Sequence, residues 1–226
     1  LENTYRAVNI ALIDEWTKFS KINDINLLEV LDAIKMRPSH SNIMGPGIGV
    51  GGYCLTKDPL FADISQKEIL KSKHIVNFEF SNLAFNVNKK MTNFSLNLIR
   101  KNYKNITNKK FLMLGLAYKD DIGDIRNSPS LKIYQKLIKM NAILDFYDPY
   151  VSISKEITKK SIKDFSSISK FDCIILAVKH SIFKKIKFSK LDLKKNIIIF
   201  DFVNLISPKE LKLLKEKNIN VIYLGK

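Results

Sequence analysis

Residues 111–131 read FLMLGLAYKDDIGDIRNSPSL, an apolar run that stops at Gly115 and gives way to a helical pattern from about Ser130. Further short apolar runs at 143–147, 173–178, 197–200 and 221–224 alternate with helical stretches at about 130–140 and 208–217. Alternating buried strands and helices are typical of a parallel, doubly wound sheet. We therefore predict an α/β, Rossmann-like domain over residues 105–226.

The chain before this sheet has a helical pattern. Apolar residues recur at three- and four-residue spacing over 4–19, which predicts a long amphipathic first helix; they are Tyr5, Val8, Leu12, Trp16 and Phe19. A second helical stripe follows Asn26, which together with Glu29 resembles a capping box. A longer helix is predicted from about 76 to 103. The polar segment 101–110 then marks the change of pattern, so we predict a helical domain at 1–104.

A glycine-rich loop interrupts the helical pattern. Residues 37–54 read RPSHSNIMGPGIGVGGYC, and this density of glycine excludes regular helix or strand. Gly47, Gly49 and Gly52 match the dinucleotide fingerprint G-x-G-x-x-G, but here the match follows a helix and a proline instead of a strand. The strand-to-helix unit at 111–131 has Gly115 but no glycine cluster. Neither place therefore predicts an ordinary NAD site.

Cys54 has the surroundings of a reactive thiol. Lys57 lies three residues further on, and Asp58-Pro59 predicts a helix that begins there and runs to about residue 70; both features favour the thiolate. The glycines before Cys54 would let backbone N–H groups approach a ligand closely. Asp58 has two compatible interpretations, a helix cap and a carboxylate that positions a water near the cysteine. Cys173, inside the apolar run FDCIILAV, is interpreted as buried packing.

The formal net charge of +16 could indicate a nucleic-acid partner or an anionic membrane. Almost all of this charge is scattered lysine, so nucleic-acid binding ranks last among the functions considered. No apolar run reaches the roughly 18 to 20 residues of a membrane span, and the first residues lack a signal-peptide pattern. Two cysteines are too few for a disulfide framework, so we predict a cytoplasmic protein. His40, His74 and His180 show no metal spacing, so no metal site is predicted.

Several motifs, in the right order along the chain, resemble the UDP-glucose and UDP-N-acetylmannosamine dehydrogenases, a family of nucleotide-sugar 6-dehydrogenases. GPGIGVGGYCLTKDPLF at 45–61 is similar to the family's catalytic loop, and ENTYRAVNIALIDE at 2–15 to the start of its dimerisation helix. LGLAYKDDIGDIRNSP at 114–129 is similar to the opening of its UDP-binding domain, and FYDPYV at 146–151 and the terminal YLGK fit as well. The resemblance covers essentially the whole chain. It implies a central domain that forms a homodimer through its first long helix, followed by a UDP-binding domain.

The resemblance implies a two-step oxidation of a UDP-sugar C6 alcohol to a carboxylate, with two NAD used in succession. By analogy Cys54 would attack the intermediate aldehyde, and a thioester would form and be hydrolysed. Asn3 matches an asparagine that holds the oxyanion and its water, and Asp58 matches the aspartate of the hydrolytic step. Lys57 and Arg126 match residues expected near NAD. Positions expected to contact the substrate are Asn42, Gly47, Gly49, Gly51, Tyr118 and Lys119.

Each of these roles has a plainer alternative. Considered without the family, Asn3 could sit in a frayed helix start, Arg126 could be a surface partner of Asp124, and Tyr118 could pack beneath a turn. A non-catalytic, dimeric UDP-sugar-binding module is the alternative to an enzyme.

Parts of the family pattern are missing or changed. The catalytic lysine would lie two residues before Leu1, and the NAD-binding domain would come before it, so NAD is expected to bind mainly outside this chain and the chain alone is expected to be inactive. The region around His40 holds histidine and serine where relatives often carry an arginine that reaches the partner subunit's substrate. DFVNLI at 201–206 lacks the arginine or glycine seen there in some relatives. Some residues of the motifs favour UDP-glucose as the substrate and others favour a UDP-N-acetylhexosamine, so the sequence does not decide between these sugars.

Overall fold

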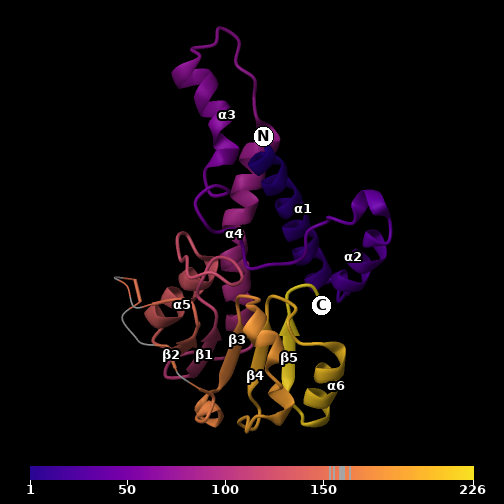
Figure 1. Cartoon of the computed structure of the whole chain (residues 1–226), viewed down its shortest axis with the longest axis vertical. Coiled ribbons are helices and arrows are strands. Elements are labelled where there is room, and N and C mark those ends of the chain that lie inside the picture. Colours follow the sequence, from indigo (N-terminus) through magenta and orange to yellow (C-terminus); the bar gives the residue numbers. More distant parts are fainter. Residues whose placement is uncertain (153, 155, 158–160, 163) are drawn as a thin grey trace.

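The structure is a computed structural model that describes residues 1–152, 154, 156–157, 161–162 and 164–226. A helical region stands above a parallel sheet, and the two are joined by one long helix (Figure 1). The main helices of the upper region are α1 (Glu2–Ile22), α2 (Leu27–Lys35), the short α3 (Phe61–Ile64) and α4 (Glu79–Lys101). A short 3₁₀ turn at Pro38–His40 follows α2.

The lower region is a five-stranded, all-parallel sheet. Its strands are β1 (Lys110–Leu114), β2 (Ile143–Tyr147), β3 (Cys173–Leu176), β4 (Ile198–Asp201) and β5 (Asn220–Tyr223). Their order across the sheet is β2-β1-β3-β4-β5, so the direction of winding reverses between β1 and β3. The predicted doubly wound α/β architecture after a helical region is confirmed, and each strand lies within two residues of its predicted bounds.

Alternation along each buried strand builds a core on both faces of the sheet. Phe111 and Met113 of β1 pack on the face covered by α4 and by α5 (Pro129–Lys139). Leu112 and Leu114 face the opposite side, where α6 (Pro208–Glu216) and 3₁₀ turns at Ile168–Lys170, Ser181–Lys185 and Phe188–Lys190 cover the sheet. Strands buried on both faces require a continuous apolar sequence, so the short apolar runs predict the strands.

Helix α4 connects the two regions. Val87 lies in a cluster with residues of α1, whereas Leu96 and Ile99 further along the helix pack on the sheet. The division predicted between residues 104 and 105 stays a prediction, because α4 packs in both regions.

Helix α1 packs through its small side chains. Ala7 and Ala11 are buried against α4, and the Asn88 side chain donates a hydrogen bond to the Ala7 carbonyl oxygen at 3.0 Å. The predicted apolar stripe lies mostly outside this contact, with exposed fractions of 61% at Tyr5, 49% at Leu12, 50% at Trp16 and 48% at Phe19. Helix α1 therefore presents an uncovered apolar face.

Two predicted helix caps were wrong. Asn26 lies at the N-cap position just before α2, but within the described residues its side chain makes no capping hydrogen bond, so the capping box does not form. Asp58 is the first residue of a 3₁₀ turn (Asp58–Leu60) instead of its cap, because its carboxylate is bound by other side chains. The expected continuous helix to residue 70 is also divided into that turn, the single turn α3 and a π-helical turn at Ser65–Ile69.

The end of the chain returns to the helical region. The backbone N–H of Leu27 donates to the Gly225 carbonyl oxygen at 2.8 Å, and the Lys21 amine donates to the Lys226 carbonyl oxygen. A Cβ atom on Gly225 would lie 2.8 Å from the Pro46 ring, so the approach of the two segments is close. These last residues therefore connect the sheet to the helices in addition to α4.

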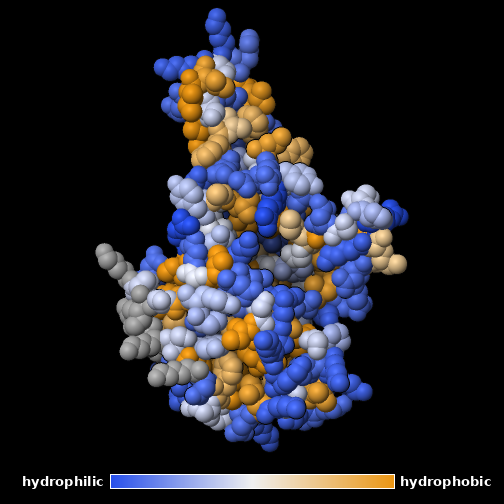
Figure 2. Space-filling model, in the orientation of Figure 1, coloured by the Kyte–Doolittle hydropathy of each residue, from blue (hydrophilic) through white to orange (hydrophobic). Residues whose placement is uncertain are grey.

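The lobe formed by α3 and the loop after it projects furthest from the sheet. Figure 2 shows hydrophobic residues gathered over it, and Ile69, Leu70 and Val76 are more than half exposed. Among the described residues, no helix combines the length and the apolar character that crossing a membrane requires.

Candidate functional site

The glycine loop is held between α4 and the segment that opens α5. On the α4 side, the Thr92 hydroxyl donates to the Ile48 carbonyl oxygen at 3.2 Å, and a Cβ on Gly49 would lie 3.0 Å from that hydroxyl oxygen. On the other side, the Gly52 N–H donates to the Arg126 carbonyl oxygen at 2.9 Å. The loop therefore has a fixed path even though it contains no regular structure.

Glycine is required at positions 51 and 52 because Tyr118 lies directly beneath them. A Cβ on Gly51 would lie 2.7 Å from the Tyr118 Cβ, and one on Gly52 would lie 2.7 Å from its ring. Gly52 also has a φ of +81°, which disfavours any other residue. Tyr118 therefore packs beneath a turn, which is the plainer role considered for it. This packing places the turn after β1 against residues 51–57, here called the cysteine loop.

Cys54 is exposed at the end of the glycine loop, whereas Cys173 is buried in β3. Burial raises the pKa of the Cys173 thiol, as expected for a packing residue. The Cys54 carbonyl oxygen accepts hydrogen bonds from the N–H groups of Lys57 and Asp58, at 3.0 and 2.9 Å. This turn fixes Cys54 next to Lys57 and Asp58, so the three residues form one structural unit.

Asp58 is the centre of a small polar network next to Cys54. Its carboxylate accepts a hydrogen bond from the Lys57 amine at 2.9 Å and another from the Asn3 side-chain amide at 2.7 Å. The hydrogen bond from Lys57, helped by that from Asn3, holds the pKa of Asp58 below its ordinary value. The same contact raises the pKa of Lys57. Asp58 is therefore an anion near neutral pH.

Two cations lie on the same side of the loop. The Lys57 amine stands 4.3 Å from the ring centres of both Tyr53 and Phe61, in cation–π geometry. The Arg126 guanidinium is 5.7 Å from the Tyr53 ring and forms an ion pair with Asp124 at 2.6 Å, the surface pairing considered for it. That pairing raises the pKa of Arg126.

Other predicted residues lie apart from this network. Asn42 is exposed in the turn after Pro38–His40, and Lys119 is exposed in the turn after β1. No hydrogen bond within the described part of the chain joins either of them to Cys54. Gly47 lies in open surroundings, with nothing within 4 Å of the position its Cβ would occupy.

The structure adds polar residues that the sequence analysis missed. The Asn127 side-chain amide donates to the Gly52 carbonyl oxygen at 3.0 Å, and the Thr56 hydroxyl donates to the same oxygen at 2.9 Å. Asn127 has a φ of +52°, and the pattern R-N-S-P was the available signal for such a turn. Asn127 and Thr56 thus fix the carbonyl two residues before Cys54.

A second missed group lies at the carboxyl ends of β2 and β3. His180 and Asp148 are fully or almost fully buried, with 3.2 Å between the His180 Nε2 and an Asp148 oxygen. Burial opposes ionisation of Asp148, but hydrogen bonds from His180 and from the N–H groups of Leu116 and Tyr150 lower its pKa below its ordinary value. The Asp121 N–H donates to His180 Nδ1 at 2.8 Å. This pair orders the turn that follows β1 and was visible in the sequence only as Asp148-Pro149.

The chain matches two domains of one known protein family. Residues 1–90 match the central domain of the UDP-glucose/GDP-mannose dehydrogenase family, and residues 112–208 match its UDP binding domain. This chain belongs to the UDP-glucose/GDP-mannose dehydrogenase family. Both matched regions carry parts of the site, since Cys54 lies in the first and Arg126 in the second.

Individual members of the family support the assignment. A UDP-N-acetyl-D-mannosamine dehydrogenase from Methanococcus vannielii is 36% identical over the whole of this chain and 50% of its own length. The solved UDP-D-ManNAc dehydrogenase of Pyrococcus horikoshii is 29% identical with a TM-score of 0.78, over 99% of this chain and 50% of that one. An NDP-N-acetyl-D-galactosaminuronic acid dehydrogenase from Methanosarcina mazei is 27% identical with a TM-score of 0.86, over 100% of this chain and 49% of that one. The chain spans about half the length of these relatives.

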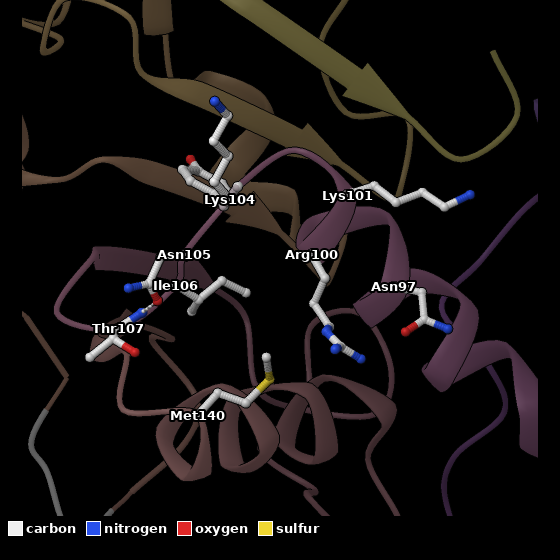
Figure 3. A pocket seen from close by; sticks show the side chains of 9 residues that line it. Asn97, Arg100, Lys101, Lys104, Asn105, Ile106, Thr107 and Met140 are labelled. Atoms are coloured by element: carbon white, nitrogen blue, oxygen red, sulfur yellow. Dashed lines mark hydrogen bonds between the residues drawn. The ribbon is translucent and has the colours of Figure 1, made fainter.

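Hollows in the surface of this family member do not all lie at the cysteine. One of about 470 Å³ lies where α4 gives way to β1, and Figure 3 shows Arg100 reaching into it near Met140 while Lys101 and Lys104 point away. It is remote from Cys54, and its cations do not converge. A smaller hollow of about 170 Å³ lies at the carboxyl ends of β4 and β5, next to Asp201 and Gly45. Among the described residues, no three His, Cys, Asp or Glu side chains are grouped as metal ligands.

Proposed function

We propose that this chain carries the nucleophile and the UDP-sugar site of an NAD-dependent UDP-sugar 6-dehydrogenase. The observation that supports it best is the network of Asn3, Asp58 and Lys57 next to an exposed Cys54. These residues come from α1 and from the cysteine loop, so the fold brings distant positions to the thiol. The names of the most similar relatives favour a UDP-N-acetylhexosamine, and UDP-N-acetyl-D-mannosamine in particular, as the substrate.

In the proposed reaction the C6 alcohol loses a hydride and a proton to give an aldehyde. The Cys54 thiolate adds to the aldehyde carbon, and the new C–S bond gives a thiohemiacetal. Loss of a second hydride and proton leaves a thioester, and water then breaks the C–S bond to release the carboxylate and the thiolate. NAD, when bound, accepts the hydride in each of the two oxidations.

Asn3 and Asp58 suit the steps that involve water and a negatively charged oxygen. The contact with Asp58 uses one of the two N–H donors of the Asn3 amide, which leaves the second for the developing oxyanion. Asp58 has a lowered pKa and is therefore a weak base. We infer that it orients the attacking water by accepting a hydrogen bond from it.

The UDP portion is assigned to the crevice at the carboxyl ends of the strands. Ligands of doubly wound sheets bind where the winding direction reverses, which here is between β1 and β3. Tyr118 and Lys119 lie in the turn after β1, and the Tyr118 ring lies under the cysteine loop. A diphosphate held near Lys119 would place the attached sugar toward that loop.

Lys57 and Arg126 fit the approach of an anionic dinucleotide. Both are cations near the Tyr53 ring, and neither is buried. The glycine loop itself does not form the strand-to-helix turn of a dinucleotide site, since residues 41–54 contain neither strand nor helix. We therefore assign only part of the NAD contacts to this chain.

The uncovered face of α1 supports a homodimer. Leu12 and Trp16 lie half exposed on this face, next to Tyr5 and Phe19. Contiguous exposed apolar patches of this kind mark protein–protein contacts. A second copy of the chain, packed through its own α1, would cover both faces.

Calorimetric titration of this chain with UDP, UDP-glucose and UDP-N-acetyl-D-mannosamine tests the substrate site. We expect saturable binding of UDP and tighter binding of the UDP-N-acetyl-D-mannosamine. Cys54→Ala should leave these affinities almost unchanged. An absence of binding to all three would contradict the UDP-sugar site.

Catalysis needs a second experiment, in which the chain is fused to the half of the Methanococcus vannielii sequence that it does not cover. The fusion should form the uronate with two NADH per sugar. Cys54→Ala should abolish uronate formation, while the control Cys173→Ala should retain it. Normal turnover by the Cys54→Ala fusion would show that Cys54 is not the nucleophile.

A further inference from the structure

A hollow of about 240 Å³ lies behind the cysteine loop, and the proposed reaction does not use it. Three segments form its wall: Leu55 and Thr56 from the loop, Asn88 and Lys89 from α4, and Lys132 from α5. Its volume corresponds to several water molecules at about 30 Å³ each. It is therefore large enough for a small organic anion.

The charged side chains in the wall of this hollow are all positive. Lys89 and Lys132 reach the hollow from two different helices, and no carboxylate of the described residues lines it. Although the Lys132 side chain as a whole is exposed, partial burial of its amine, together with the positive charges of Lys89 and Lys136, lowers the pKa of Lys132. Cations that repel one another at a concave surface are stabilised when an anion binds between them.

The remaining wall adds an apolar surface and a helix terminus. Leu55 and Phe85 supply apolar atoms. Lys132 lies in the first turns of the eleven-residue helix α5, whose positive end is capped by the Ser128 hydroxyl. A ligand with a charged end and a short carbon portion would fit both kinds of surface.

We propose that this hollow binds a small phosphate monoester and that binding steadies the cysteine loop. Lys89 and Lys132 would hold the phosphate through charge-assisted hydrogen bonds. Leu55 and Thr56, in the wall, are the two residues after Cys54, so the ligand would connect α4 and α5 to the loop that carries the thiol. This inference concerns binding, and it stands or falls independently of the role of Cys54 in catalysis.

The test uses the full chain with glycerol 3-phosphate and inorganic phosphate as probes, at ionic strength kept constant with chloride. Glycerol is the uncharged comparison. Calorimetry should give saturable binding of glycerol 3-phosphate and none of glycerol. Tighter binding of glycerol 3-phosphate than of inorganic phosphate would support a contact with the apolar wall. Binding of inorganic phosphate alone would contradict the proposal that the ligand is a phosphate monoester.

Lys89→Gln with Lys132→Gln should weaken glycerol 3-phosphate binding by roughly tenfold or more, since two charge-assisted contacts are lost. The control pair, Lys90→Gln with Lys139→Gln, removes the same charge from the same two helices outside the hollow. Equal weakening in both pairs would show only a general effect of net charge and would overturn the site.

Hydrogen–deuterium exchange of the unmodified chain provides a measurement that needs no variant. Glycerol 3-phosphate should slow exchange in residues 51–57 and near Lys89, and should leave the hollow at Arg100 unchanged. Protection spread over the lysine-rich surface, or none in the cysteine loop, would contradict the proposal.

Discussion

The side-chain amide of Asn3 lies 2.7 Å from a carboxylate oxygen of Asp58, although 55 positions separate the two residues. This contact joins the first turn of α1 to the segment that follows Cys54. It explains why Asp58 does not cap a helix, since its oxygens are bound by Asn3 and Lys57. The polar network is thus a tertiary feature that local sequence does not determine.

Asp58→Asn keeps the shape of the side chain and removes its charge. In the fused enzyme we expect hydrolysis of the thioester to slow by roughly 100-fold, because the water loses the carboxylate that orients it. Mass spectrometry should then detect the sugar attached to Cys54. Asp63→Asn is the control, because Asp63 pairs with Lys67 outside the network. Normal turnover without the adduct would contradict this role.

Gly52→Ala should destabilise the chain by about 1 to 3 kcal/mol, because Gly52 has a φ of +81° and lies against the Tyr118 ring. Thermal unfolding measures the loss. Gly47→Ala is the matched control in the same loop, because a Cβ there meets nothing within 4 Å. Equal stability of the two variants would show that the loop adapts to the added methyl group.

Asn127→Gly keeps the left-handed turn available and removes the amide that donates to Gly52. Loss of one such hydrogen bond costs about 1 kcal/mol. Local opening of the cysteine loop should therefore increase roughly fivefold. Hydrogen–deuterium exchange of residues 52–57 measures this, and exchange in β1 should not change. Unchanged exchange in the loop would mean that Asn127 does not hold it.

Asp14 in α1 predicts a pH dependence of stability. It is 2% exposed, and one of its oxygens has no hydrogen-bond partner in the part of the chain that the structure describes. Burial raises its pKa from 3.8 to about 7. Between about pH 4 and pH 7 the folded chain therefore binds a proton that the unfolded chain releases. The ionisable carboxyl of Asp14 thus does not lower the free energy of unfolding below pH 4, and it lowers it increasingly as the pH rises to about 7. Asp14→Asn should stabilise the chain by roughly 2 to 4 kcal/mol at pH 8 and by almost nothing at pH 4. A gain that does not change with pH would assign the effect to packing.

Trp16→Glu should weaken self-association of the chain, because it places a charge on the uncovered face of α1. Sedimentation velocity should show a dimer for the unmodified chain and a monomer for the variant. Lys109→Gln changes the net charge by the same amount at a distant exposed position and should leave the dimer intact. A monomeric unmodified chain would contradict association through α1.

The α/β fold was predictable because each strand is an apolar run long enough to cross the core. The packing of α1 was less so. Periodicity selects the face with Leu12 and Trp16, yet the face that packs on α4 carries Ala7 and Ala11. Small side chains allow close approach of two helices, and hydrophobicity alone does not show which of two apolar faces is covered within the chain.

The site was predictable where it depends on local spacing. Cys54, Lys57 and Asp58 lie within five residues, so one turn brings them together. Asn127 and the buried pair of His180 and Asp148 could not be predicted in this way. Asn127 contacts Gly52, which lies 75 positions away in the glycine loop. His180 and Asp148 meet only when β1, β2 and β3 lie side by side.

The hydrogen bond between Leu27 and Gly225 also bears on how the chain is made. During synthesis α1 and α2 emerge before the residues that close over them, which come almost 200 positions later. This surface of α1 and α2 therefore stays uncovered while the later residues are synthesised, at about 5 to 20 residues per second. This contact can therefore form only after all five strands of the sheet have been synthesised.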